Sequence, residues 1–145
     1  MNGEKMKKIA LLLLVSLACV SVNAQKNPTK TSYVEARRLY DQFDKTLSRA
    51  LLWEKTSVQD RRKAINDAIQ LRETIDKALG EFSQCSKAGA AHVDFVLNLN
   101  SFSASAQSGS AIKPFDVLGA MQSAERFGNS RAPCYDEVAA LEIKK

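Results

Sequence analysis

Histidine is almost absent from this sequence, which has one histidine, one tryptophan, three prolines and three cysteines among its 145 residues. A tetrahedral zinc site draws mainly on histidine and cysteine, so no zinc site is expected. The sequence also lacks a Gly-x-Ser-x-Gly elbow, a phosphate-binding loop and a pair of catalytic carboxylates. His92 could serve as a base for a nearby serine, but nothing in the sequence fixes that geometry. We therefore predict that the protein is not an enzyme.

A basic face with interleaved aromatic residues, which is typical of nucleic-acid binding, is also missing. The triplet Arg61, Arg62 and Lys63 concentrates positive charge locally, but acidic residues are interleaved along the whole chain. We expect no nucleic-acid partner.

The first 24 residues have the pattern of a secretory signal peptide. Three lysines precede an apolar run at residues 9–22, and small residues at Val22 and Ala24 suit cleavage after Ala24. The run is too short for a comfortable membrane span of ~20 residues. We predict a periplasmic or secreted protein with no membrane anchor after cleavage. Removing residues 1–24 takes away three lysines and one glutamate, so the formal charge falls from +5 to +3.

After cleavage only two cysteines remain, Cys85 and Cys134. An oxidising compartment favours their pairing, and both occur among apolar residues at helical spacing. Closing a loop of ~50 residues would stabilise the fold by roughly 4 kcal/mol. The alternative is a pair of buried free thiols. No Cys-x-x-Cys motif is present, so a catalytic thiol is not expected.

Residues 25–31 are polar and predict a flexible leader, and residues 32–145 predict a single helical domain. A first helix is expected over 32–55, where apolar residues recur every three or four positions. A second, over 57–85, carries a wide apolar stripe that includes Ile75, Phe82 and Cys85. Gly80 could end this second helix or be tolerated within it at a cost of ~1 kcal/mol. The short link between the two predicts a long N-terminal antiparallel hairpin.

The third segment, residues 87–107, fits two periods. As a helix it places six apolar or weakly polar residues on one face; as a strand, Phe95, Leu97 and Leu99 alternate with polar neighbours. The alternation changes phase after Asn100, whereas the helical face continues, so a helix is favoured across the disputed residues 93–106. The residues of that face are Ala88, His92, Phe95, Leu99, Phe102 and Ala106.

The last part of the sequence predicts one or two further helices. Pro114 opens a helix that is expected to end near Gly128, and Pro133 opens a final segment with Cys134 and Val138 on one face. The expected fold is therefore all-α: a four- to five-helix bundle with one disulfide.

A small exported bundle without catalytic motifs is best interpreted as a non-enzymatic protein-binding module. Inhibitors or immunity proteins, secretion accessories and chaperone-like escorts are proteins of this kind. The expected partner is another protein in the same extracytoplasmic compartment. The surfaces to inspect are Arg61, Arg62 and Lys63, and the weakly helical region 98–110.

One alternative function belongs to a different class. His92 and Met121 come from different predicted helices and could ligate haem iron, as in periplasmic electron carriers built on helical bundles. No Cys-x-x-Cys-His attachment motif accompanies them. No cofactor is therefore predicted, and haem remains the alternative hypothesis.

Overall fold

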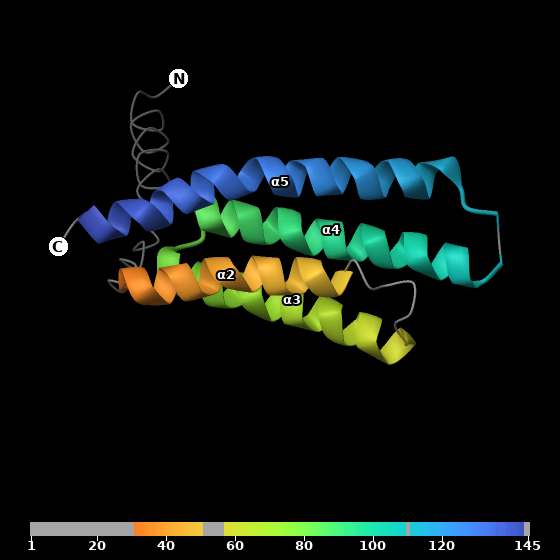
Figure 1. The fold of residues 1–145 in the computed structure, drawn as a ribbon, viewed down its shortest axis with the longest axis horizontal. Helices are drawn as coiled ribbons and strands as arrows, with labels where there is room; N and C mark the ends of the chain where they lie inside the picture. Colours follow the sequence, from red (N-terminus) through yellow and green to blue (C-terminus); the bar gives the residue numbers. More distant parts are fainter. Residues whose placement is uncertain (1–30, 51–56, 110, 144–145) are drawn as a thin grey trace, which may run out of the picture.

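The computed structural model describes residues 31–50, 57–109 and 111–143, with the backbone alone described for 47–50. These residues form four α-helices and no strand, which confirms the all-helical prediction for this part of the chain (Figure 1). Helices α4 and α5 pack side by side along their length, and α2 and α3 cover one side of that pair. The helices are α2 (Tyr33–Ala50), α3 (Val58–Leu79), α4 (Gln84–Gln107) and α5 (Pro114–Ile143).

Helix α2 begins at a side-chain cap and buries one stripe. The backbone N–H of Glu35 donates to Ser32 Oγ at 3.3 Å, which satisfies one of the donors that a helix start leaves unpaired. Ala36, Leu39 and Phe43 are at most 2% exposed. Residues 51–56 lie outside the described residues, so the predicted link to α3 and the hairpin that it would close remain predictions.

Helix α3 starts close to the predicted position, and Ser57 and Asp60 form a capping box there. Asp60 N–H donates to Ser57 Oγ, and Ser57 N–H donates back to the Asp60 carboxylate at 3.2 Å. These hydrogen bonds stabilise the ionised carboxylate and lower the pKa of Asp60. The start of α3 is therefore encoded locally, by two residues that are three positions apart.

Helix α3 ends at Leu79, which decides between the two predictions for Gly80. Gly80 has a φ of +96°, a backbone conformation that favours glycine, and its N–H donates to the carbonyl of Asp76. Ser83 then caps α4 by accepting from Ser86 N–H at 2.9 Å. The prediction that one apolar stripe runs through Phe82 to Cys85 was wrong. Phe82 lies in the turn and is 79% exposed, and Cys85 belongs to the first turn of α4.

The disputed third segment is helical throughout as α4. Ala88, His92 and Val96 are at most 1% exposed, at the three- and four-residue spacing of a helix. Gly89 lets α4 approach α3 closely, because a Cβ there would lie 3.3 Å from Arg72 Cγ. The helical prediction for this segment is confirmed, and the strand alternative is wrong.

Helix α5 is continuous, whereas the sequence predicts a break between Gly128 and Pro133. Phe127, Cys134 and Val138 are buried along one stripe that spans the predicted break. Proline inside a helix removes one backbone hydrogen bond. Burial of this stripe against α2 and α4 offsets that loss, so the helix passes through Pro133 without ending.

The structure contains the predicted Cys85–Cys134 pair, with the two sulfur atoms 2.03 Å apart. Both residues are at most 2% exposed, so the disulfide lies in the core between the start of α4 and the second half of α5. We call this end of the molecule proximal and the opposite end, near the α4–α5 turn, distal. None of the described helices combines the length and the apolar character that crossing a membrane requires.

Candidate functional site

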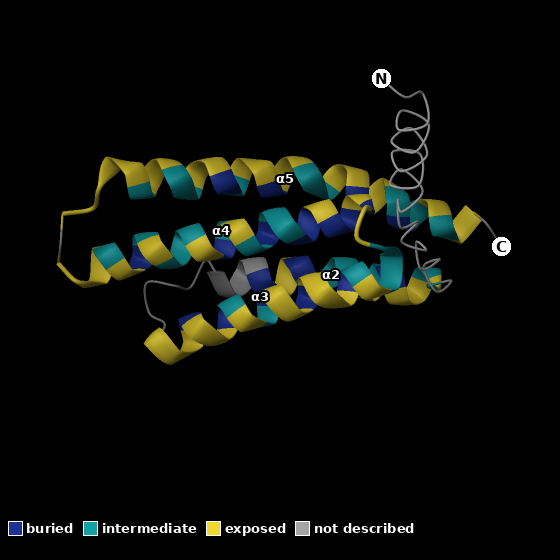
Figure 2. Cartoon of the chain, turned by 180° about the vertical axis from the view of Figure 1, so that it is seen from behind, coloured by how far each residue is buried: buried dark blue, intermediate teal, exposed yellow. Residues whose placement is uncertain are grey.

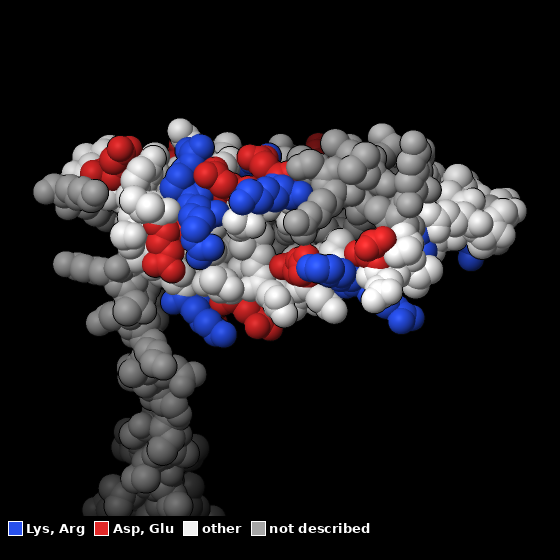
Figure 3. All heavy atoms as spheres, turned by 60° about the horizontal axis from the view of Figure 1, so that its bottom comes forward, with Lys and Arg blue, Asp and Glu red and all other residues white. Residues whose placement is uncertain are grey.

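The three basic residues singled out from the sequence do not form one open patch. Arg61 is only 5% exposed and hydrogen-bonds to the Gln107 side chain, because it lies on the same face of α3 as the buried Ala64. Arg62 is exposed, and Lys63 pairs with Asp67 at 2.8 Å. On the face shown in Figure 3, basic and acidic side chains lie next to one another rather than in separate patches.

The two haem ligands of the alternative hypothesis lie in different environments. His92 is 1% exposed, between the rings of Phe43 and Phe127, whose centroids are 5.2 and 4.9 Å away. Met121 is 65% exposed and precedes Phe127 by six residues, or about 9 Å along α5. The structure therefore does not bring His92 and Met121 to a shared ligand position.

His92 is nevertheless an unusual core residue. Neither imidazole nitrogen has a hydrogen-bond partner among the described residues. Burial, and secondarily the positive charge of Arg131, lowers the pKa of His92 to about 4. The side chain is thus a neutral, aromatic filler of the core at pH 7, and its burial removes it from contact with a substrate.

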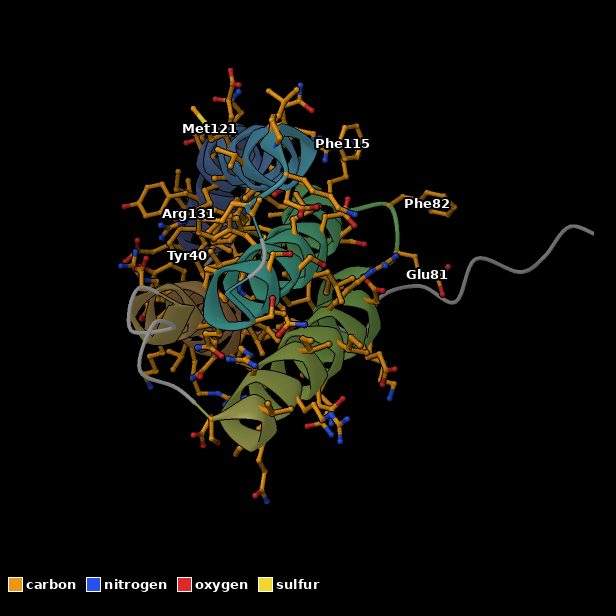
Figure 4. The ribbon with its side chains drawn as sticks, turned by 90° about the vertical axis from the view of Figure 1, so that its right-hand side faces the viewer. Tyr40, Glu81, Phe82, Phe115, Met121 and Arg131 are labelled. Carbon is orange, nitrogen blue, oxygen red and sulfur yellow. A yellow bond between two sulfur atoms is a disulfide. The ribbon has the colours of Figure 1, made fainter. Side chains whose placement is uncertain are left out.

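Alternating aromatic and cationic groups fix α2 on α5. Arg131 pairs with Asp44 at 2.6 Å and lies 5.2 Å from the Tyr40 ring centroid. The Tyr40 ring in turn contacts the ring of Tyr135. The guanidinium carbon of Arg37 lies 5.4 Å from the centroid of the Tyr135 ring. A hydrogen bond with Tyr135 and the charge of Asp41 raise the pKa of Arg37. Figure 4 shows Tyr40 and Arg131 on the same side of the bundle. This cluster holds the helices in register.

The groove between α4 and α5 is filled by α2 in its proximal half. The ring of Phe43, from α2, contacts the ring of Phe127 from α5, with centroids 5.5 Å apart. It also contacts the ring of His92 from α4. Phe95 stacks on Phe127 at the distal edge of the same cluster, with centroids 6.1 Å apart. An aromatic side chain from a third helix thus closes this half of the groove.

The same groove continues toward the distal end as a shallow hollow of about 260 Å³. We call it the distal groove, and it is lined by Leu99, Phe102, Val117, Ala120, Met121 and Ala124. On α4, Leu99 and Phe102 follow His92 and Phe95 at helical spacing, so they continue the face that α2 covers. Every lining residue is apolar.

Exposed apolar side chains lie on both flanks of α5 near its start, at the distal end of the molecule. Phe115 is 82% exposed, Met121 65% and Leu118 51%. Figure 4 shows Phe115 and Met121 on opposite flanks of α5, and Figure 2 shows the first turns of α5 largely exposed. An exposed apolar cluster of this size is typical of an interaction surface.

The distal half of the α4–α5 pair is also poor in charge. Residues 95–124 contain only one lysine, Lys113, and one acidic residue, Asp116. Asp116 is engaged within the fold, because it accepts a hydrogen bond from Ser105 at 3.2 Å. The distal groove was not predicted from the sequence, although the low charge density of residues 95–124 is a sequence feature that could have indicated it.

Within the described residues, no group of three histidine, cysteine, aspartate or glutamate side chains could hold a metal ion. Comparison of the chain with models of protein families, with curated proteins and with solved structures gave no match.

Proposed function

We propose that the protein is an exported, non-enzymatic protein-binding module whose partner contacts the distal end of the α4–α5 pair. The partner is another protein of the same extracytoplasmic compartment, which this module would inhibit, escort or help to secrete. The single observation that supports the proposal most is the apolar distal groove, together with the exposed Phe115, Leu118 and Met121 at the start of α5.

The energetics of these side chains favour an interface. Fully burying one exposed large apolar side chain contributes up to about 1.5–3 kcal/mol, and three partly to largely exposed residues of this kind lie within two turns of α5. Aromatic residues and methionine are enriched at interface cores, where charged residues are depleted. The composition of residues 95–124 has both features.

A rigid base makes such a surface effective, because less entropy is lost on binding. The Cys85–Cys134 disulfide and the Arg131–Asp44 ion pair hold the helices together at the proximal end. In this proposal α2 and α3 form the predicted antiparallel hairpin and serve as the base on which α4 and α5 rest. A disulfide also supports export, since oxidising compartments preserve it.

Site-directed photo-crosslinking in the producing cells tests the proposal. A photoreactive residue replaces Leu118, and the matched control places it at Glu73, an exposed position on α3. We expect one stoichiometric adduct with an extracytoplasmic protein from position 118 and none from position 73. Equal labelling at both positions, or no protein adduct at either, would contradict the proposal.

A further inference from the structure

We propose that the distal groove binds an amphipathic helix of the partner, which lies end to end with α2 along the groove between α4 and α5. This inference rests on the proposed function and specifies the structural element that the partner presents. Its basis is continuity with an interface that the molecule already contains.

Helix α2 shows what this groove accepts. Its residues Ala36, Leu39 and Phe43, spaced as i, i+3 and i+7, are buried at no more than 2% exposure in one cluster with residues of α3, α4 and α5. The Phe43 ring contacts both His92 and Phe127, one residue from each wall of the groove. A helix with an aromatic or aliphatic residue at this spacing is therefore complementary to the proximal half.

The same faces of α4 and α5 that line the proximal half of the groove also line its distal half. Leu99 follows His92 by seven positions on α4, and Ala120 precedes Phe127 by seven positions on α5, so both lie two turns further along the same faces. The described length of α2 ends at Ala50. Recognition of an amphipathic helix through anchors at i, i+3 or i+4 and i+7 is a common mode of protein binding.

The chemistry of the walls defines the bound face of the partner helix. Because residues 95–124 carry only Lys113 and Asp116, the anchors must be apolar and long-range charge steering is weak. Met121 suits a groove that adapts to its ligand, because its side chain is unbranched and flexible. Binding should therefore depend little on salt, in contrast to binding by the basic residues Arg62 and Lys63.

A peptide with the sequence of residues 33–50 is the probe, because its apolar face already fits the proximal half. It is stapled through positions 38 and 42, since an isolated helix of 18 residues is marginally stable in water. The reporter is the Met121 methyl resonance of full-length protein with labelled methionine, assigned with Met121→Leu. We expect a saturable shift with the peptide and none with a control peptide that carries Leu39→Ala and Phe43→Ala.

Three substitutions in the full-length protein locate the contact by fluorescence anisotropy of the labelled peptide. Met121→Lys places a charge in the distal groove and should weaken binding at least about tenfold. Gln122→Lys adds the same charge one position away, outside the groove lining, and should change affinity by less than about twofold. Glu73→Lys makes a larger charge change at an exposed position on α3 and should also change affinity by less than about twofold.

Three results would overturn the inference. The first is the absence of a saturable Met121 shift up to about 1 mM peptide, the limit of weak specific binding. The second is a nuclear Overhauser contact between Met121 and Trp53 in the free protein, which would mean that the chain's own residues 51–56 occupy the groove. The third is a Met121 shift that grows with protein concentration in the absence of peptide, in parallel with self-association of the protein. This result would assign the groove to a second copy of the chain.

The failure of this inference is distinguishable from the failure of the proposed function. If the crosslinked partner binds Met121→Lys normally but loses affinity for Phe115→Lys, the partner contacts the other flank of α5. The protein would then remain a binding module, and only the helix-in-groove contact would be wrong. The absence of any crosslinked protein would contradict the proposed function itself.

Discussion

The carboxylate of Glu137 accepts a hydrogen bond from the backbone N–H of Cys85 at 2.9 Å, so a side chain of α5 caps the start of α4. Glu137 lies three residues beyond Cys134, the disulfide partner of Cys85. A covalent bond and a charge-assisted hydrogen bond thus fix the same pair of helix segments. The proximal end is clamped, and the distal end presents the groove.

Removing the disulfide should cost much of the stability. For a double Cys85→Ser and Cys134→Ser variant, we expect the free energy of unfolding to fall by roughly 4 kcal/mol, because the unfolded chain is no longer cross-linked. Chemical denaturation followed by circular dichroism measures the change. An unchanged denaturation midpoint would show that the pair contributes nothing to stability.

Glu137→Gln tests the cap across the helices. The amide keeps an acceptor but loses the negative charge at a helix N-terminus, so we expect a loss of about 0.5–1 kcal/mol. Glu142→Gln, at an exposed position near the end of the same helix, is the matched control and should not be destabilising. Equal losses in both variants would argue against a specific role for the Cys85 contact.

Burial of His92 predicts acid sensitivity with a definite sign. The pKa of His92 falls from 6.5 to about 4 in the folded chain, so the unfolded state binds more protons between these values. Stability should therefore decrease as the pH falls from 6.5 to 4, by roughly 3 kcal/mol in all, and this contribution should level off below pH 4.

His92→Leu isolates that contribution from carboxylates that titrate in the same range. The variant should lose this part of the pH dependence, which urea denaturation at pH 7, 5.5 and 4.5 would reveal as a gain in its stability relative to the parent protein as the pH falls. Parallel pH profiles for the two proteins would mean that His92 is not buried as described.

Two glycine substitutions should have opposite effects. Gly128 lies inside the continuous α5, where no atom would contact an added Cβ, so Gly128→Ala should stabilise the fold by about 1 kcal/mol. Gly80 ends α3 at a φ of +96°, so Gly80→Ala should destabilise it by about 1 kcal/mol or more. Destabilisation by Gly128→Ala would indicate a helix end at that residue, as the sequence predicted.

The helical class, the start of α3 and the cysteine pair could be predicted because each depends on local or countable features. The start of α3 was predicted to within one residue, although not from the Ser57–Asp60 box that forms it, and two cysteines allow only one pairing. The phase of Leu99 and Phe102 was enough to favour a helix over a strand for α4.

The remaining features depend on tertiary contacts that a single sequence does not reveal. Pro133 and Gly128 resemble helix-ending residues, but burial of Phe127 and Cys134 on a common stripe keeps α5 continuous. From the sequence, Arg61 is expected to be a surface cation, whereas in the structure it hydrogen-bonds to Gln107 of α4. The distal groove needs two helices in register, so no single segment could disclose it.

The most direct test of partner binding in the distal groove is an affinity measurement with the crosslinked partner, once it is identified. The affinity is measured for three forms of the protein: the parent, Met121→Lys and Gln122→Lys. If the partner binds in the distal groove, Met121→Lys should weaken binding at least about tenfold, while the affinity of Gln122→Lys should stay within about twofold of the parent. Equal affinity for all three forms would contradict the claim that the partner binds in the distal groove.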